Sequence, residues 1–250
     1  MQRRVIGVSG THAAQAPAVR APIILLFTCT AGSVDAITFL NAHVFTANMT
    51  GNTALLGIYA GQGDGTAALH SLIALCTYVA GVALGVLLTA DVTQQTARAL
   101  LRAVLVEAAV LVVFGAGHLA SGSVHSLAVT RALIGCSGVA MGMQSATVMR
   151  LQLPGLATTY ITGTVTTLVF NMVRRARQTH SAAHDESGRF DRPAALQAMV
   201  FVTYALAALT SVVLYGHWPS AVALLPVVAI ASVALAMAAA AGRDLGGTHS

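Results

Sequence analysis

The sequence contains no lysine and very little charge of either sign. Its 13 basic residues are all arginine, its acidic residues number 8, and charged residues make up 8% of the 250. An ordinary soluble domain carries about 25% charged residues, whereas this chain is 56% apolar with a mean hydropathy of +0.76. The composition indicates an integral membrane protein whose main partner is the lipid bilayer, and we expect no nucleic acid among its partners.

Several familiar patterns are also missing. No run of alternating ten-residue strands occurs, and the apolar runs approach the roughly 20 residues that a membrane-spanning helix needs, so helices are favoured over a barrel. The chain has no Walker loop, dinucleotide fingerprint, His-Glu-x-x-His or Gly-x-Ser-x-Gly motif. Their absence argues against an ATP-driven pump or a familiar membrane hydrolase, and we predict no cofactor.

The potential metal ligands are scattered. The three cysteines, Cys29, Cys76 and Cys136, lie in separate apolar segments without ligand spacing, which favours packing as small apolar residues. Five histidines fall near the predicted outer face, where solvated interfacial side chains are favoured over a metal or pH-sensing cluster. These are His43, His70, His118, His125 and His217. We therefore predict no metal site.

Two stretches, Asp35 to Thr53 and Gln144 to Thr164, share a pattern of small and polar residues. Superposing Gly32 on Gly142 pairs Asp35 with Ser145 in the sequence. Superposing Gly51 on Gly163 requires two extra residues in the second copy and pairs Thr50 with Thr162. A shared small-polar pattern after the first apolar segment of each half is typical of a membrane protein built from two structural repeats.

The apolar runs predict an all-α membrane protein with six spans. The spans lie at about 22–40, 68–89, 103–119, 125–149, 194–215 and 220–241. Two further segments, 44–60 and 157–173, are apolar but interrupted by polar residues and glycine. The predicted organisation is a basic tail 1–20, one membrane domain 21–241 with repeats 21–120 and 124–241, a hydrophilic loop 174–193, and a tail 242–250.

The arginines predict the orientation, because basic residues stay on the cytoplasmic side of the membrane. If the two interrupted segments dip in and return, twelve of the thirteen arginines are cytoplasmic, as are both chain termini, in a bacterial inner membrane. Three spans per repeat is an odd number, so the repeats are inverted. The alternative, in which both segments cross, gives eight helices and parallel repeats and moves Arg98, Arg102 and Arg150 outside.

Asp35 is the strongest single candidate for function. An acid near the middle of a spanning helix costs about 2.5 to 3.5 kcal/mol, so it needs a partner. Counting residues puts Arg131 at nearly the same depth as Asp35, which predicts a buried ion pair between the repeats. The pair is either structural or part of substrate or proton coupling. Glu107, which has no obvious partner in the sequence, is a possible proton carrier or an acid that reaches the interface.

The Thr-Gly turns form the second candidate site. If half-helices begin there, their amide ends would point towards the centre of the membrane and favour an anionic or polar solute. The alternative, without a role in solute binding, is that Thr and Asn only stabilise a helix kink. The predicted pathway residues are Asp35, Asn48, Thr50, Gly51, Asn52, Gln144, Thr162, Gly163 and Thr164.

Four motifs together resemble the YoaK-like family of bacterial multi-pass membrane proteins. They are Gly32-x-x-Asp35-Ala36, Met49-Thr50-Gly51-Asn52-Thr53, Met141-Gly142-x-Gln144-x-Ala146 and Thr162-Gly163-Thr164. Ser145 departs from the family pattern, which has Asn after Gln144. The resemblance implies a membrane fold and location, but the family has no known function and so supplies no substrate.

The leading functional hypothesis is a transporter or channel-like permease for a small polar or anionic solute, driven by a proton gradient or by downhill diffusion. One alternative is a membrane-embedded enzyme using Asp35, Glu107 and a histidine. Another is a non-catalytic scaffold, and a homo-oligomer is compatible with each. Solute flux, turnover without flux, or a co-purifying partner without either would distinguish the three.

Overall fold

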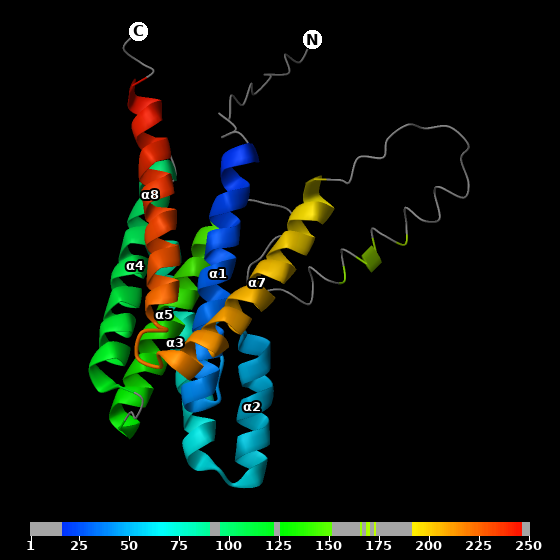
Figure 1. The fold of residues 1–250 in the computed structure, drawn as a ribbon, viewed down its shortest axis with the longest axis vertical. Coiled ribbons are helices and arrows are strands. Elements are labelled where there is room, and N and C mark those ends of the chain that lie inside the picture. Colours follow the sequence, from blue (N-terminus) through cyan, green and yellow to red (C-terminus); the bar gives the residue numbers. More distant parts are fainter. Residues whose placement is uncertain are drawn as a thin grey trace, which may run out of the picture.

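The fold is a bundle of long helices (Figure 1). The computed structural model describes residues 17–90, 96–122, 126–151, 166, 169–170, 173 and 192–246. These residues contain seven helices and no strand, as predicted for an all-α protein. The helices are α1 (Pro17–Ala42), α2 (Met49–Gln62), α3 (Gly65–Leu88), α4 (Thr96–Ser121), α5 (Leu127–Arg150), α7 (Arg192–His217) and α8 (Leu224–Gly246).

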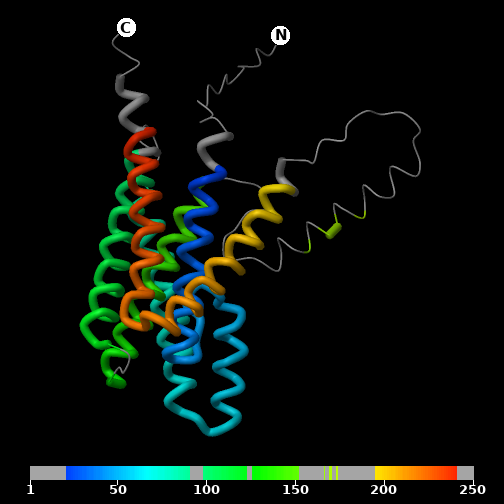
Figure 2. The backbone as a smooth tube through the Cα atoms, viewed as in Figure 1, coloured from blue at the N-terminus to red at the C-terminus, as the bar shows by residue number. Residues whose placement is uncertain are grey.

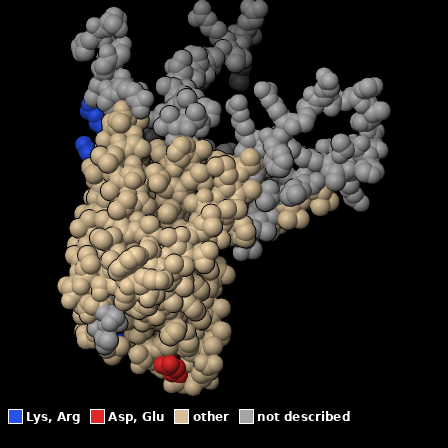
Figure 3. Space-filling view, viewed as in Figure 1, with Lys and Arg blue, Asp and Glu red and all other residues tan. Residues whose placement is uncertain are grey.

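Five of these helices are long and apolar enough to cross a membrane. They are α1, α3, α4, α5 and α7. In α8 the apolar part covers Leu224–Ala240, which is shorter than the other five, and α2 has 14 residues, about 21 Å of helix. The visible face is almost entirely uncharged, with its few charged atoms near its ends (Figure 3). The described helices therefore belong to a multi-pass membrane protein.

Helices α2 and α3 form a tight hairpin because the turn between them supplies both caps. Gly63 ends α2 with a φ of 76°, a left-handed conformation that glycine adopts without strain. Asp64 then begins α3, its side chain accepting a hydrogen bond from the amide of Ala67. The sequence predicted a turn at this position, and α3 begins three residues earlier than the predicted span.

Two helix pairs approach so closely that backbone meets backbone. A Cβ added to Gly32 of α1 would lie 2.6 Å from the carbonyl oxygen of Tyr204 in α7. A Cβ added to Gly142 of α5 would lie 2.2 Å from the carbonyl oxygen of Tyr78 in α3. Because glycine has no side chain, the backbones of the two helices can come into van der Waals contact, which is a main source of helix association in membranes.

The direction of the helices follows from these contacts. Helix α1 runs parallel to α7, since Asp35 meets Tyr204 and, further along both helices, Asn41 meets Tyr215. Helix α3 runs parallel to α5, as Gly138 packs on Thr77 and Ala146 on Gly85. Helix α1 is antiparallel to α5, since the start of α5 lines a cavity with the end of α1, and Gln144 near the end of α5 contacts Phe27.

The core lies where α1, α4, α5 and α8 meet. One face of α4 is buried along its whole length, at intervals of three and four residues that keep the side chains in one stripe. Its members include Ala103, Val104, Glu107, Leu111, Phe114 and His118. They pack against large side chains of α1 and α5, such as Phe27 and Met141, and of α8, such as Ile230. Two titratable residues thus lie in an otherwise apolar stripe.

Candidate functional site

Asp35 fastens the chain between α1 and α2 to the interior of the bundle. Its Oδ1 accepts hydrogen bonds from the backbone amides of Thr46 and Ala47, each at 2.7 Å. Its Oδ2 accepts one from the hydroxyl of Tyr204 at 2.5 Å. The side chain is buried, at 2% exposure. Both carboxyl oxygens are therefore occupied by the protein itself, which offsets the cost of burying an acid.

Asn52 holds the same chain segment from the other side. Its Oδ1 accepts a hydrogen bond from the amide of Phe45 at 2.9 Å, and its Nδ2 donates to the carbonyl oxygen of Phe45. Asn48 caps α2 by accepting from the amide of Gly51 at 3.1 Å. Residues 43–48 are thus fixed by α1 on one side and by α2 on the other, which explains the clustering of polar residues in this motif.

The consequence is that α2 begins part-way along the bundle, near the level of Asp35. Asp35 lies seven residues before the end of α1, so its bonds to Thr46 and Ala47 bring the chain back by roughly 10 Å before α2 starts. Helix α2 then runs beside α3 to the turn at Gly63 (Figure 2). The non-helical residues are 43–48, at the start of the predicted interrupted segment 44–60, whereas Thr50, Gly51 and Asn52, which were predicted to form the turn, lie in the first turn of α2.

The predicted pathway residues divide into two groups. Asp35 and Asn52 are buried and fully engaged in hydrogen bonds within the protein. Asn48 and Thr50 are exposed among the described residues and Gly51 is half-buried. Three predicted residues of the second segment lie outside the described residues, namely Thr162, Gly163 and Thr164.

The structure does not bring Asp35 and Arg131 together, although the sequence predicted an ion pair. The partners of Asp35 are backbone amides and Tyr204, and the buried Nε of Arg131 has no partner within the described part of the chain. The contacts between α1 and α5 explain the difference. Thr130 lies with Asn41 and Ala42 around a cavity at the end of α1, so Arg131 lies nearer that end than Asp35 does.

Gln144 and Glu107 are both fully buried. Gln144 donates from Nε2 to the carbonyl oxygen of Phe27 at 3.0 Å, while its Oε1 has no partner among the described residues. Neither carboxyl oxygen of Glu107 has a partner there. Glu107 therefore does not reach the membrane interface, which was one of the two alternatives predicted for it. Gln144 joins α5 to α1 within the core.

A second tyrosine contact resembles the first. The hydroxyl of Tyr78 in α3 donates to Oγ of Ser145 in α5 at 2.8 Å, as that of Tyr204 donates to Asp35. Sequence analysis paired Asp35 with Ser145 but missed both tyrosines. A repeated dipeptide, Thr77-Tyr78 and Thr203-Tyr204, was the signal that would have found them.

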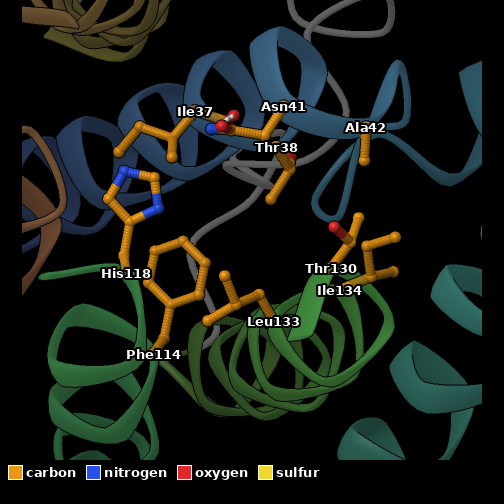
Figure 4. A pocket seen from close by; sticks show the side chains of 9 residues that line it. All are labelled: Ile37, Thr38, Asn41, Ala42, Phe114, His118, Thr130, Leu133 and Ile134. Atoms are coloured by element: carbon orange, nitrogen blue, oxygen red, sulfur yellow. Dashed lines mark hydrogen bonds between the residues drawn. The ribbon is translucent and has the colours of Figure 1, made fainter. Parts of the chain in front are cut away.

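A small cavity, with room for about one water molecule, lies between α1, α4 and α5 near the end of α1 (Figure 4). His118 and Phe114 of α4 face Ile37 across it, and Leu133 closes another side. The polar side chains at its wall are engaged: Nε2 of His118 lies 2.8 Å from the carbonyl oxygen of Pro219, and Asn41 accepts from Tyr215. The cavity is mainly apolar and offers few polar groups to a solute.

Removing the hydroxyl of Tyr204 tests the role of Asp35. We expect Tyr204→Phe to lower the free energy of unfolding by about 1.5–3 kcal/mol, because a hydrogen bond to a buried carboxylate is lost. Tyr215→Phe is the control: it lies on the same helix and removes a bond to an uncharged acceptor, so about 0.5–1.5 kcal/mol is expected. Denaturation of the purified protein measures both. Equal losses would show that Tyr204 is an ordinary packing residue.

Comparison with known proteins agrees with the resemblance seen in the sequence. Residues 23–237 match the family model described as "Protein of unknown function (DUF1275)". The chain is 30% identical over 198 residues to the UPF0700 transmembrane protein YoaK of Bacillus subtilis (strain 168), covering 78% of this chain and 83% of that protein. No solved structure matches.

Proposed function

The chain belongs to the DUF1275 family, and we propose that it is a transporter or channel-like permease for a small polar or anionic solute. One observation carries the proposal, which is that α2 begins part-way along the bundle, near the level of Asp35, and not at its end. Non-helical backbone at membrane depth is tolerated where it is buried in protein or lines a cavity. The non-helical segment here is residues 43–48. Asp35 and Asn52 are buried and hydrogen-bond to this segment, whereas Asn48 and Thr50 are exposed. We assign the pathway to the side on which these two residues are exposed.

We propose further that the two halves, 21–120 and 124–241, are inverted repeats. Support comes from helix contacts: α1 packs on α7 as α5 packs on α3, and α1 packs on α8 as α5 packs on α4. Exchanging α1 with α5, α3 with α7 and α4 with α8 converts each of these four contacts into its counterpart. The tyrosine contacts at Asp35 and Ser145 obey the same exchange, and α1 and α5 are antiparallel. In this arrangement the second break would lie in 157–173, with Thr162, Gly163 and Thr164.

The proposed membrane arrangement has six spans, formed by α1, α3, α4, α5, α7 and α8. Helix α2 enters and leaves on one side. After α1 ends at Ala42, the chain returns to the level of Asp35, and α2 then runs back towards the side on which α1 ends. The even total of six spans then puts both chain termini on one side, the cytoplasm of a bacterial cell, with the arginine-rich loop 174–193 on the same side. The proposed location is the inner membrane.

We assign proton coupling to Glu107, a buried acid in an apolar stripe. Acids inside spans mark proton relays because they are otherwise costly to keep. We expect Glu107→Leu to raise the free energy of unfolding by about 1–3 kcal/mol, since it removes an unpartnered carboxyl group from the core. Proton-driven flux should fall in both Glu107→Leu and Glu107→Gln. A loss of stability in Glu107→Leu would contradict the assignment, because it would reveal a stabilising partner of the acid.

Flux into proteoliposomes tests the proposed function. Labelled acetate, phosphate and glycerol serve as probes, and Thr50→Val is the variant, because it removes the exposed hydroxyl at the break while keeping the side-chain shape. We expect at least one probe to enter with wild-type protein and to enter several times more slowly with Thr50→Val. Thr53→Val, one turn further along α2 and bonded to the carbonyl oxygen of Met49, is the control. No flux with any probe, or equal flux in Thr50→Val and Thr53→Val, would contradict the proposal.

A further inference from the structure

Two buried nitrogen atoms without partners lie at the end of the bundle where α3 and α5 begin. Nε2 of His70 and Nε of Arg131 both have no hydrogen-bond partner in the described ranges. His70 is buried, at 7% exposure, and Arg131 is half-buried. A buried polar atom left unsatisfied costs about 1–3 kcal/mol, and more when the group is charged. Two such atoms at one place point to a ligand.

The register between α3 and α5 puts the two side chains opposite each other. Thr77 packs against Gly138, and the helices are parallel. His70 and Arg131 each lie seven residues earlier, which is close to two full turns, so they share the level and the face of that contact. Arg131 is also near enough to act electrostatically on His70. One turn further along each helix, Ala74 and Ile134 belong to a buried apolar cluster with Ala42 and Val44.

The His70 ring is oriented by the end of α1. The backbone of Ala42, the last residue of α1, acts on the ring, and the carbonyl at that helix end has no partner within the helix. Because a carbonyl only accepts, the ring nitrogen facing it is the donor, and the unpartnered Nε2 carries a lone pair in the neutral imidazole. Nε2 therefore binds either a proton together with an anion or the acidic hydrogen of a protonated acid. The two descriptions give the same bound complex.

The local charge favours an anion. Arg131 of α5 and Asp64 at the start of α3 are the charged groups that act on His70, and the backbone of Ala42 in α1 acts on it as well. Arg131 lies in the first turns of α5, whose positive dipole end adds to its charge. The acid predicted to neutralise Arg131, Asp35, is bonded elsewhere. Among the described residues, Nε of Arg131 thus has no acidic partner, and it lies near a buried imidazole.

We infer that His70 and Arg131 form a binding site for a small oxyanion, a carboxylate or an inorganic oxyanion, which is bound together with one proton. The planar guanidinium suits an oxyanion because its N–H groups match two oxygens. The proton on Nε2 supplies a second hydrogen-bond donor from the opposite side of the anion. That this anion is the transported solute rests on the proposed permease function, whereas the binding site does not.

Calorimetry on the purified full-length protein tests the site, with acetate, phosphate and chloride as probes. Titration in two buffers of different ionisation enthalpy gives the number of protons taken up. We expect acetate or phosphate to bind with about one proton per anion in the wild type. Arg131→Gln should weaken binding by about tenfold or more, since a charge-assisted bond is lost. His70→Gln should abolish the proton uptake.

Controls separate this site from general charge effects. Arg150→Gln at the exposed far end of α5 and His217→Gln, an exposed histidine bonded within its own helix, should bind like the wild type. If Arg131→Gln does not fold, Arg131→Lys keeps the charge but loses Nε and should bind more weakly. No binding of either oxyanion, chloride binding as tight as theirs, or equal binding in variants and controls would overturn the inference.

Flux of the bound anion distinguishes this inference from the proposed function. Binding that depends on His70 and Arg131 without any flux would leave the site standing and remove the permease proposal. Flux of acetate or phosphate that is unchanged in His70→Gln and Arg131→Gln would leave the permease standing and contradict the claim that this site holds the transported solute. Flux that falls in both variants and in Thr50→Val would support the two together.

Discussion

Replacing Asp35 by asparagine is expected to lower the free energy of unfolding by about 3–5 kcal/mol. The carboxylate accepts two backbone amides on Oδ1 and the Tyr204 hydroxyl on Oδ2, and breaking a buried charged network costs this much when its members are left unpaired. The asparagine Nδ2 is a donor, so it cannot replace the second acceptor oxygen. Residues 43–48 would lose their attachment to α1, and α2 would start from an unfixed position.

Thermal or denaturant unfolding of the purified protein measures this loss. Asp64→Asn is the matched control, because Asp64 is an exposed acid that caps α3 through one backbone amide, and asparagine is an equally good cap. Its stability should stay near that of the wild type. If Asp35→Asn were as stable as the control while flux disappeared, the acid would act in coupling and not as a structural anchor.

The sequence identified the break in the chain but not what holds it. An acid in an apolar run and a Thr-Gly-Asn cluster after it were visible in the pattern, and the structure has Asp35 and Asn52 together at residues 43–48. The partners were not predictable from the pattern, because backbone amides leave no trace in residue types. Tyr204 is 169 residues away from Asp35, and only the packing of α1 on α7 brings it near.

The predicted ion pair shows where counting residues fails. Depth was counted from the apparent ends of two spans, and an uncertainty of a few residues at each end amounts to one or two helical turns. Arg131 lies in the second turn of α5, opposite His70 of α3. The relevant register was that of α3 against α5, which is set by Gly138 and Thr77 and is not encoded in the hydropathy of either run.

The last prediction concerns Gly142, where α5 meets α3. We expect Gly142→Ala to prevent folding or to lower the free energy of unfolding by about 3 kcal/mol or more. A Cβ there would lie 2.2 Å from the carbonyl oxygen of Tyr78 and 2.7 Å from the amide nitrogen of Val82. Both atoms belong to helix backbone and cannot turn aside, so the helices must separate, and overpacking of this kind exceeds the usual range of about 1–3 kcal/mol.

Gly57→Ala is the matched control for Gly142→Ala, because it is the same substitution inside a helix. A Cβ on Gly57 meets nothing within 4 Å among the described atoms, and alanine is favoured over glycine in helices by about 1 kcal/mol. Its thermal stability should therefore equal or exceed that of the wild type. Separation of α3 from α5 would also move Tyr78 away from Ser145 and His70 away from Arg131, so Gly142→Ala should lose oxyanion binding along with stability. If it folded as tightly as Gly57→Ala, the close packing of α3 on α5 would be wrong, and with it the register that places His70 opposite Arg131.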